Sequence, residues 1–236
     1  MQLWLCPLIA FLLGSIPFGL FIARMKGIDI RQHGSGNIGA TNVLRVVGKK
    51  YGITCLILDA LKGFIPTLLA YTLIRFVGQD TNFTFHGLLD HGYIFPAVDQ
   101  WKAQTLQVLT GLLSILGHNY SPWVGFKGGK GIATSAGVLI ALAPAAVVLL
   151  ILVWVITFKV SRYVSVASIV AAALLPLIII SGSWYHGKIA TGDWNKPLFV
   201  FSVVIAALAI WKHRANIQRL MNGTENRFQP KKKTDA

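Results

Sequence analysis

The fold is decided by the apolar stretch IATSAGVLIALAPAAVVLLILVWVITF, residues 132–158. A helix needs about 20 apolar residues to cross a bilayer, so this stretch is long enough for one crossing. Pro144 interrupts it, and a proline ends or kinks a helix near the residue that precedes it. The stretch is therefore either one span or two shorter helices, and the two alternatives place the C-terminus on opposite sides of the membrane.

The rest of the chain is similarly apolar. Hydrophobic residues make up 54% of the 236 residues and charged residues 13%, and the mean hydropathy is +0.61, as is typical of a protein in lipid. We expect one domain, residues 1–236. No A-x-A cleavage site follows the first apolar run, so we expect it to be a retained span rather than a signal peptide. This first run is Leu3–Ala23. Besides residues 132–158, the other apolar runs are Ile53–Val77, Thr105–Leu116, Val164–Ser181 and Pro197–Trp211.

Positive charge is distributed unevenly between the predicted loops. The chain has 22 Lys+Arg against 8 Asp+Glu, a net charge of +14. If residues 132–158 form two helices, most Lys and Arg residues fall on one side of the membrane. The other side has only Arg75, Lys102, Lys188 and Lys196, which are mixed with aspartates. Cytoplasmic loops carry such an excess of basic residues. We therefore predict an all-α integral membrane protein with seven transmembrane helices, its N-terminus outside and its C-terminus in the cytoplasm. Basic-aromatic alternation is missing, so we expect membrane lipids and not nucleic acid as partners of the basic loops.

Three long polar segments, residues 33–45, 117–137 and 213–228, fall on the predicted cytoplasmic face. The first reads HGSGNIGATNVLR. Its glycines leave backbone N–H groups accessible to a ligand, and Arg45 supplies a bidentate donor suited to phosphate or carboxylate. The segment is longer than a connection between helices requires. We expect a ligand-binding segment in which Gly36 exposes the backbone and the short polar side chains are those of Ser35, Asn37, Thr41 and Asn42.

The second segment, GHNYSPWVGFKGGKGIATSAG, contains a glycine-rich loop that leads into residues 132–158. Glycine amides before a helix N-terminus form a concave site for an anion, and a lysine in the same loop adds an ammonium. The loop is not a Walker A motif, because three residues separate Gly125 from Gly129 and a glycine follows Lys130. We predict a phosphate-binding loop without nucleotide chemistry, formed by His118, Lys127, Gly128, Gly129, Lys130 and Gly131.

The third segment, HRANIQRLMNGTENRF, follows the last apolar run. His213 and Asn216 are three residues apart and share a helix face, and a histidine can act as a base or phosphate donor near neutral pH. Glu225 is the only glutamate of the chain, and Arg219 and Arg227 lie nearby, so we expect a structural clamp. The predicted cytoplasmic loops hold too few carboxylates for a metal triad or a Ser-His-Asp arrangement, so we expect neither a metal nor a cofactor.

Taken in order, GSGNIGATNVLR, GHNYSPWVGFKGGKGIAT and HRANIQRLMNGTE closely resemble the three motifs of the bacterial membrane glycerol-3-phosphate acyltransferases that use acyl phosphate. The resemblance implies transfer of a fatty acyl group from acyl phosphate to the sn-1 hydroxyl of glycerol 3-phosphate, which forms lysophosphatidate for phospholipid biosynthesis. It also implies that Ser35 and Arg45 are required, that the glycine loop binds phosphate, and that the site faces the cytoplasm from the bacterial inner membrane. The outer loops 78–104 and 184–196 are longer than we expect for this family.

The sequence alone leaves two alternatives open on each of four points. The base that deprotonates the acceptor hydroxyl is either His213 or a phosphate oxygen of the substrate. Ser35 is either a hydrogen-bonding positioner, which we favour, or an acylated nucleophile. Asp59 and Lys62, three apart in the second apolar run, form either a local ion pair or a support of the site. The alternative function is a transporter of a phosphorylated solute. The sequence shows no half-chain repeat of the kind that many transporters have, which argues against this alternative.

Overall fold

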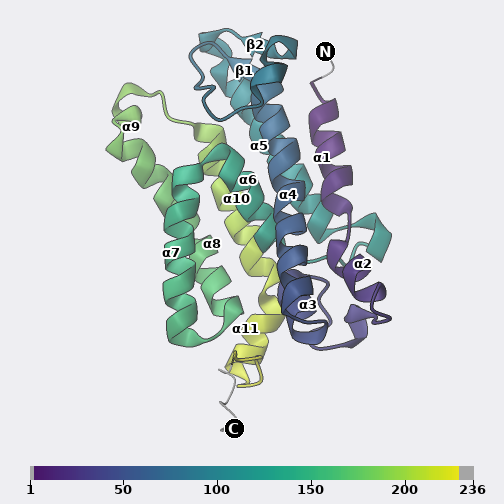
Figure 1. The fold of residues 1–236 in the computed structure, drawn as a ribbon. Coiled ribbons are helices and arrows are strands. Elements are labelled where there is room, and N and C mark those ends of the chain that lie inside the picture. Colours follow the sequence, from purple (N-terminus) through teal and green to yellow (C-terminus); the bar gives the residue numbers. More distant parts are fainter. Residues whose placement is uncertain (1–2, 229–236) are drawn as a thin grey trace.

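The computed structural model describes residues 3–228, most of which are helical (Figure 1). The end of the predicted cytoplasmic tail, residues 229–236, lies outside the described residues. The helices are α1 Leu5–Ser15, α2 Phe18–Arg24, α3 Ala40–Val46, α4 Lys49–Leu73, α5 Gln100–Asn119, α6 Ile132–Leu142, α7 Pro144–Ser161, α8 Val164–Tyr185, α9 Lys188–Thr191, α10 Lys196–Lys212 and α11 Arg214–Met221. Short 3-10 helices lie in the connections at Ile30–Gln32, His86–His91, Ala97–Asp99 and Pro122–Val124.

The stretch at residues 132–158 forms two helices, which confirms the break predicted from the proline. α6 ends at Leu142, and α7 begins at Pro144, where the missing N–H of proline has no intrahelical role. Ala143 between them has φ −152° and ψ 64°, outside the helical region. The expectation of two half-length helices is wrong for α7, because its 18 residues extend about 27 Å at the helical rise per residue. Of the two helices, α6, with 11 residues, is too short to cross a bilayer.

Four helical segments within residues 3–228 are long and apolar enough to cross a membrane, or five if the bent pair of α10 and α11 is one span. The four are α1 with α2, α4, α7 and α8. The 20-residue helix α5 is not among them. Its buried face carries the polar side chains of Gln107, Thr110, Ser114 and His118. Polar side chains inside a membrane protein face the bundle interior, so the polarity of α5 is consistent with a central position.

The first apolar run is also broken, at Ile16 and Pro17 between α1 and α2. Since the bilayer core offers no water, carbonyl groups freed by such a break need donors from the protein. Lys62 Nζ on α4 donates to the Ile16 carbonyl at 2.7 Å, and Ser121 Oγ donates to the Ser15 carbonyl at 2.6 Å. The two carbonyls at this break therefore accept hydrogen bonds from α4 and from the loop that follows α5.

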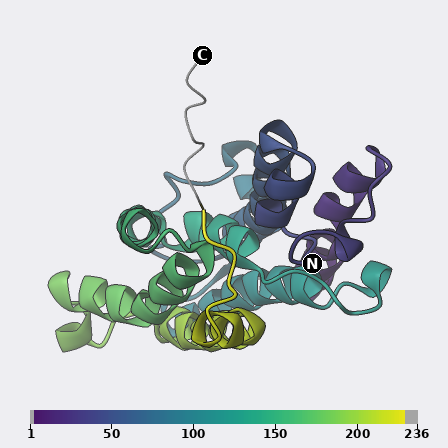
Figure 2. The ribbon, with the colours of Figure 1, turned by 90° about the horizontal axis from the view of Figure 1, so that it is seen from below.

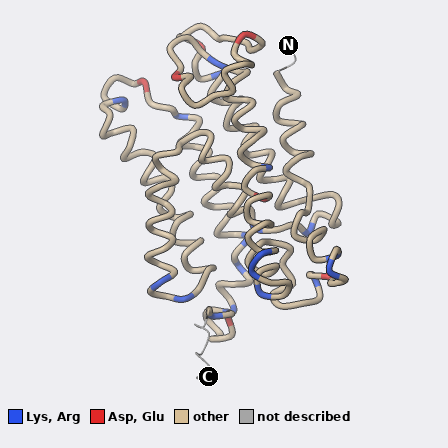
Figure 3. The backbone as a smooth tube through the Cα atoms, viewed as in Figure 1, with Lys and Arg blue, Asp and Glu red and all other residues tan. Residues whose placement is uncertain are grey.

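The helical segments run alternately between the end of the molecule that holds the N-terminus and the end that holds α11 (Figure 1). Seen from below, the N-terminal helices lie on the opposite side of the molecule from α7 and α8 (Figure 2). Lysine and arginine are concentrated toward the end that holds α3 and α11, and the middle of the bundle has few charges (Figure 3). At the other end, strands β1 Ile74–Phe76 and β2 Tyr93–Phe95 form a short parallel pair that the all-α prediction did not include.

Candidate active site

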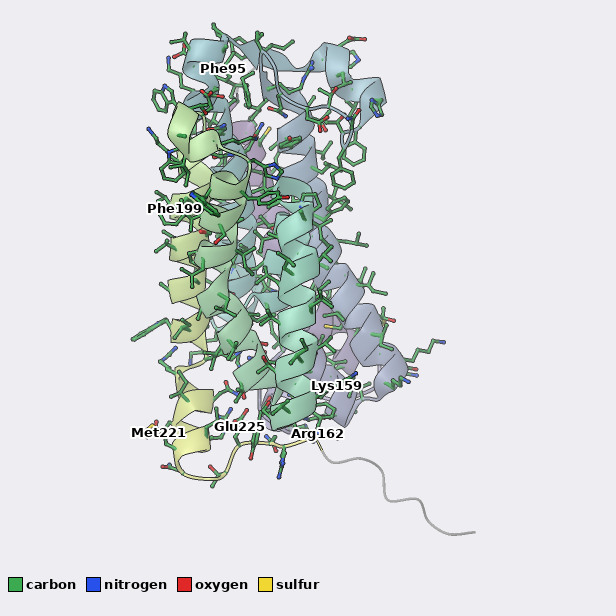
Figure 4. All side chains as sticks on the ribbon, turned by 90° about the vertical axis from the view of Figure 1, so that its left-hand side faces the viewer. Phe95, Lys159, Arg162, Phe199, Met221 and Glu225 are labelled. Carbon is green, nitrogen blue, oxygen red and sulfur yellow. The ribbon has the colours of Figure 1, made fainter. Side chains whose placement is uncertain are left out.

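One cavity of about 630 Å³ lies between α3, α4, α6, α7, α8 and α10. All three predicted polar segments contribute to its lining, at the end of the molecule where Figure 4 labels Glu225. Leu139, Val147, Leu175 and Ile205 belong to its apolar lining, which comes from the helices. The predicted site residues that line the cavity are Ser35, Asn37, Thr41, Asn42, Arg45, His118, Lys130, Gly131, His213, Asn216 and Glu225. The predicted residues that are not part of its lining are Gly36, Lys127, Gly128 and Gly129.

The first polar segment is organised by the side chain of Asn42, which is 2% exposed at the start of α3. Its Oδ1 accepts from the Ser35 backbone N–H at 2.9 Å. Its Nδ2 donates to the carbonyls of His33, at 3.0 Å, and Asn37, at 2.9 Å. Gly34 has φ +62°, and a Cβ there would lie 2.3 Å from Asn42 Oδ1. Asn42 therefore shapes the loop that presents Ser35, and its polar atoms are already engaged by this loop.

Arg45 and Ser35 offer groups that remain available to a ligand. The Arg45 guanidinium lies 5.0 Å from the centroid of the Phe228 ring, and its Nη2 donates to the Asn226 carbonyl at 3.3 Å. Its other N–H groups have no acceptor within the described part of the chain. The Ser35 hydroxyl likewise makes no hydrogen bond to another residue of 3–228, so no side chain is placed to deprotonate it. This geometry agrees better with a positioning role than with an activated nucleophile.

The glycine loop packs directly against the C-terminal end of α5. The Gly129 N–H donates to the His118 carbonyl at 3.1 Å. A Cβ at Gly128 would lie 2.0 Å from the His118 carbonyl oxygen, and a Cβ at Gly129 would lie 2.1 Å from His118 Nε2. The two glycines thus permit close approach to α5, a packing reason that the sequence interpretation did not include. Gly131, with φ +81°, occupies the left-handed region immediately before α6.

Lys130 belongs to a hydrogen-bonded chain that connects the second and third segments. Lys130 Nζ donates to Asn216 Oδ1 on α11, and Asn216 Nδ2 donates to Glu225 Oε1 at 2.6 Å. Glu225 also accepts from Arg219 Nε at 2.8 Å and from Ser165 Oγ on α8 at 2.9 Å. Glu225 therefore joins α8, α11 and the chain end beyond α11, in the manner expected of a structural clamp, while Arg227 lies over the Tyr163 ring instead.

The surroundings of this hydrogen-bonded series shift the pKa values of its two charged residues, Lys130 and Glu225. Burial lowers the pKa of Lys130 to about 8, an effect that Glu225 opposes and that Arg219 and Arg45 increase. Burial raises the pKa of Glu225, but the three hydrogen bonds that its carboxylate accepts outweigh burial and leave the pKa below its usual value. Near neutral pH the site therefore holds a carboxylate at Glu225 and an ammonium at Lys130 that loses its proton only slightly above neutrality.

His213 follows α10 directly, and its side chain is buried. Its Nδ1 lies 2.8 Å from the Ala209 carbonyl oxygen. Since a carbonyl oxygen can only accept, Nδ1 carries the proton, and the neutral ring has its lone pair on Nε2. The adjacent Lys212 donates to the Asn119 carbonyl at 2.9 Å, which ties the end of α10 to the end of α5. His213 thus brings one unprotonated ring nitrogen to the cavity.

Two contributors to the site were not identified from the sequence. Ser165 is a single serine at the start of an apolar helix, and no sequence signal distinguishes it from the other serines there. Phe228 was counted as part of the third segment, but its contact with Arg45 depends on how the chain folds back after α11. For Asp59, the sequence analysis left open a local ion pair with Lys62 or a support of the site, and Asp59 lines the same cavity.

The polar end of the cavity gathers a guanidinium, an ammonium and a neutral histidine, while its interior is apolar. No group of three or more His, Cys, Asp or Glu side chains that could hold a metal ion occurs in residues 3–228. A polar end with cationic groups joined to an apolar interior is the lining that a phosphorylated substrate with an apolar portion requires in a membrane protein.

The sequence model of the family described as glycerol-3-phosphate acyltransferase matches residues 4–223. The glycerol-3-phosphate acyltransferase of Aquifex aeolicus is 42% identical over 93% of this chain and 95% of its own length, and that of Geotalea daltonii is 43% identical over 93% and 94%. The crystal structure of PlsY, an integral membrane glycerol 3-phosphate acyltransferase, in its glycerol 3-phosphate form matches 97% of this chain and 96% of that chain with 40% identity and a TM-score of 0.76. Its lysophosphatidic acid form matches with a TM-score of 0.74. The chain belongs to the glycerol-3-phosphate acyltransferase family.

Proposed function

We propose that this protein transfers a fatty acyl group from acyl phosphate to the sn-1 hydroxyl of glycerol 3-phosphate and so forms lysophosphatidate in phospholipid biosynthesis. The observation that carries the proposal is a single cavity that joins cationic groups at its polar end to an apolar interior. Both substrates carry a phosphate, and the donor also carries an acyl chain. The solved relatives in glycerol 3-phosphate and lysophosphatidic acid forms support the same pair of acceptor and product for this chain.

In the proposed reaction, the protein positions the two phosphates and stabilises the charge that develops on them. Arg45 binds one phosphate through its free N–H groups, and Lys130 binds the other beside Gly131, the glycine of the loop that lines the cavity. Phosphate is a good leaving group from an acyl carbon, so no metal is needed to activate the donor. The acyl chain lies along the apolar lining between α6, α7, α8 and α10.

The acceptor hydroxyl must lose its proton, and two bases remain in the proposal. His213 offers its unprotonated Nε2, because Nδ1 is committed to the Ala209 carbonyl. The alternative base is a phosphate oxygen of the substrate itself. Ser35, whose hydroxyl has no partner in residues 3–228, donates a hydrogen bond to the substrate in this scheme and forms no covalent intermediate.

We further propose that α1 with α2, α4, α5, α6, α7, α8 and α10 form seven crossings of the bacterial inner membrane. The alternation of these segments in Figure 1 supports this count. The concentration of basic residues at the end of α3 and α11 supports a cytoplasmic site, an outer N-terminus and a cytoplasmic C-terminus. The short helix α6 packs against α4, where Gly63 and Gly137 allow the two backbones to approach, and this contact compensates for its length.

The function is tested with purified protein, radiolabelled glycerol 3-phosphate and palmitoyl phosphate in detergent. We expect labelled lysophosphatidate, and we expect an Arg45→Met variant to form little of it. Arg24→Met serves as the matched control, because Arg24 is a basic residue that does not line the cavity. Uptake of glycerol 3-phosphate by proteoliposomes, without acyl transfer in the detergent assay, would instead support the transporter.

A further inference from the structure

Asp59 and Lys62 form an ion pair deep in the bundle that the proposed reaction does not use. Lys62 Nζ lies 2.8 Å from Asp59 Oδ1, and both side chains are 3% exposed. A buried pair of this kind stabilises a fold little more than apolar residues of similar volume would. Lys62 serves the break between α1 and α2 through the Ile16 carbonyl, so the question that remains is what Asp59 does beside the cavity.

A second contact leads from Asp59 toward the site. His118 Nδ1 lies 3.6 Å from Asp59 Oδ1, the oxygen that Lys62 also contacts, and His118 Nδ1 has no hydrogen-bond partner within residues 3–228. A hydrogen bond between nitrogen and oxygen has a length of about 2.9 Å, so a shift of well under 1 Å would join them. Both Asp59 and His118 line the cavity. The geometry thus pairs a buried carboxylate with a buried imidazole at the base of the site.

The opposite edge of the same imidazole touches the glycine loop. A Cβ on Gly129 would lie 2.1 Å from His118 Nε2, and the Gly129 N–H donates to the His118 carbonyl. Lys130, which follows in the chain, extends to Asn216. The orientation of the His118 ring therefore determines where the loop, its amides and the Lys130 ammonium lie.

Asp59 is a poor candidate for binding substrate directly. A carboxylate repels phosphate, and this repulsion is strong in a buried site. Lys62 offsets the charge of Asp59 and also donates to the Ile16 carbonyl, so the pair adds little net charge to the cavity. Asp59 Oδ2 accepts from Cys55 Sγ at 3.6 Å within α4, and the contact that leads from Asp59 to the glycine loop is the one with His118.

We propose that Asp59 is a positioning residue that acts through His118 to hold the glycine loop and Lys130 against the substrate phosphate. This inference rests on the acyl transfer proposed above. It also assigns to His118 the role of a support beneath the loop, in addition to its place in the cavity lining.

A double-mutant cycle on Asp59→Asn and His118→Asn tests the proposal, with kcat and KM measured for each substrate separately. We expect each single variant to lower kcat/KM by about 100-fold, the cost of a misplacement of about 1 Å. The double variant should lie within about twofold of the worse single variant, since both changes disturb one connection. Effects that multiply in the double variant would overturn the proposal, and so would an Asp59→Asn variant with unchanged kinetics.

Two further measurements separate positioning from stability. Trypsin cleavage after the exposed Lys127 should accelerate in Asp59→Asn if the loop is released, and this readout does not depend on activity. Asp59→Glu retains the charge but shifts the carboxylate, so if Asp59→Asn does not fold, the folded fraction of Asp59→Glu should show a raised KM. An unchanged KM would count against positioning. Asp99→Asn is the matched control, because Asp99 pairs with Lys102 at the same spacing on an exposed surface. A wild-type protein that lacks acyl transfer would refute the function alone, since the cleavage comparison would still test the loop.

Discussion

Replacement of Gly129 by alanine should displace the glycine loop without unfolding the protein. The added Cβ would lie 2.1 Å from His118 Nε2, whereas non-bonded heavy atoms keep a distance of about 3.5–4.0 Å. One partner must therefore move by roughly 1.5 Å to restore this separation. The His118 side chain is buried against α4 and has little space to rotate, so we expect most of the movement to occur in the loop.

The magnitude follows from the displacement. A misplacement of about 1 Å costs about 100-fold in rate, so kcat/KM of Gly129→Ala should fall at least that far. The assay is acyl transfer by purified protein in detergent, with KM measured separately for glycerol 3-phosphate and for acyl phosphate. We expect the KM of the substrate whose phosphate contacts the loop to rise more than the other.

Gly182→Ala on α8 is the matched control, because a Cβ there meets nothing within 4 Å. Its kinetics should equal those of the wild type. The reasoning is refuted if Gly129→Ala is folded and has wild-type kinetics for both substrates. It is equally refuted if the variant loses its folded state while the remaining folded fraction retains full activity, because the glycine would then serve packing alone.

Further predictions concern stability, pH, mechanism and topology. Gly137→Ala would place a Cβ 1.9 Å from the Ala60 carbonyl oxygen on α4, so thermal unfolding in detergent should reveal a loss of about 1–3 kcal/mol. Lys130 is charged below its pKa of about 8, so kcat/KM should decrease as the pH rises through this value, whereas bound phosphate should move the decrease in kcat to higher pH. Ser35→Ala should lose about 2–4 kcal/mol of transition-state stabilisation, and acyl phosphate alone should leave no covalent label on the wild type. A cysteine at residue 82 should react with an impermeant thiol reagent in intact cells, and a cysteine at residue 159 should not.

The sequence predicted those parts of the fold that depend on local chemistry. Pro144 has no N–H to donate, and the helix break beside it follows from this property alone. The length of α7 did not follow, because the helix continues past the apolar stretch 132–158 through Lys159 to Ser161, and its end depends on packing. The run 105–116 was counted among the predicted spans, but its extension to the 20 residues of α5 with a buried polar face did not follow, because the added residues include Gln100, Lys102 and Gln104.

The site residues likewise comprise some that local chemistry predicts and others whose role depends on contacts between distant parts of the chain. Arg45, Lys130 and His213 could be predicted from side-chain chemistry and motif spacing, and all three line one cavity. The two glycines before Lys130 were interpreted from the conformational freedom of glycine, which cannot indicate that His118 lies against them. Contacts between distant parts of the chain, such as Ser165 with Glu225, separated by 60 positions, have no local signature.

The interruption at Ile16 has a consequence for biosynthesis. The donor to its carbonyl lies 46 positions later in the chain, and the donor to the Ser15 carbonyl lies 106 positions later. At a synthesis rate of about 5–20 residues per second, the second donor emerges roughly 5–20 seconds after its acceptor. During this interval the Ile16 and Ser15 carbonyls of the nascent first crossing lack these two side-chain donors. The Ile16 and Ser15 carbonyls gain these donors only after α4 and the loop after α5 have been synthesised, so the first crossing is completed by segments that emerge long after the crossing itself.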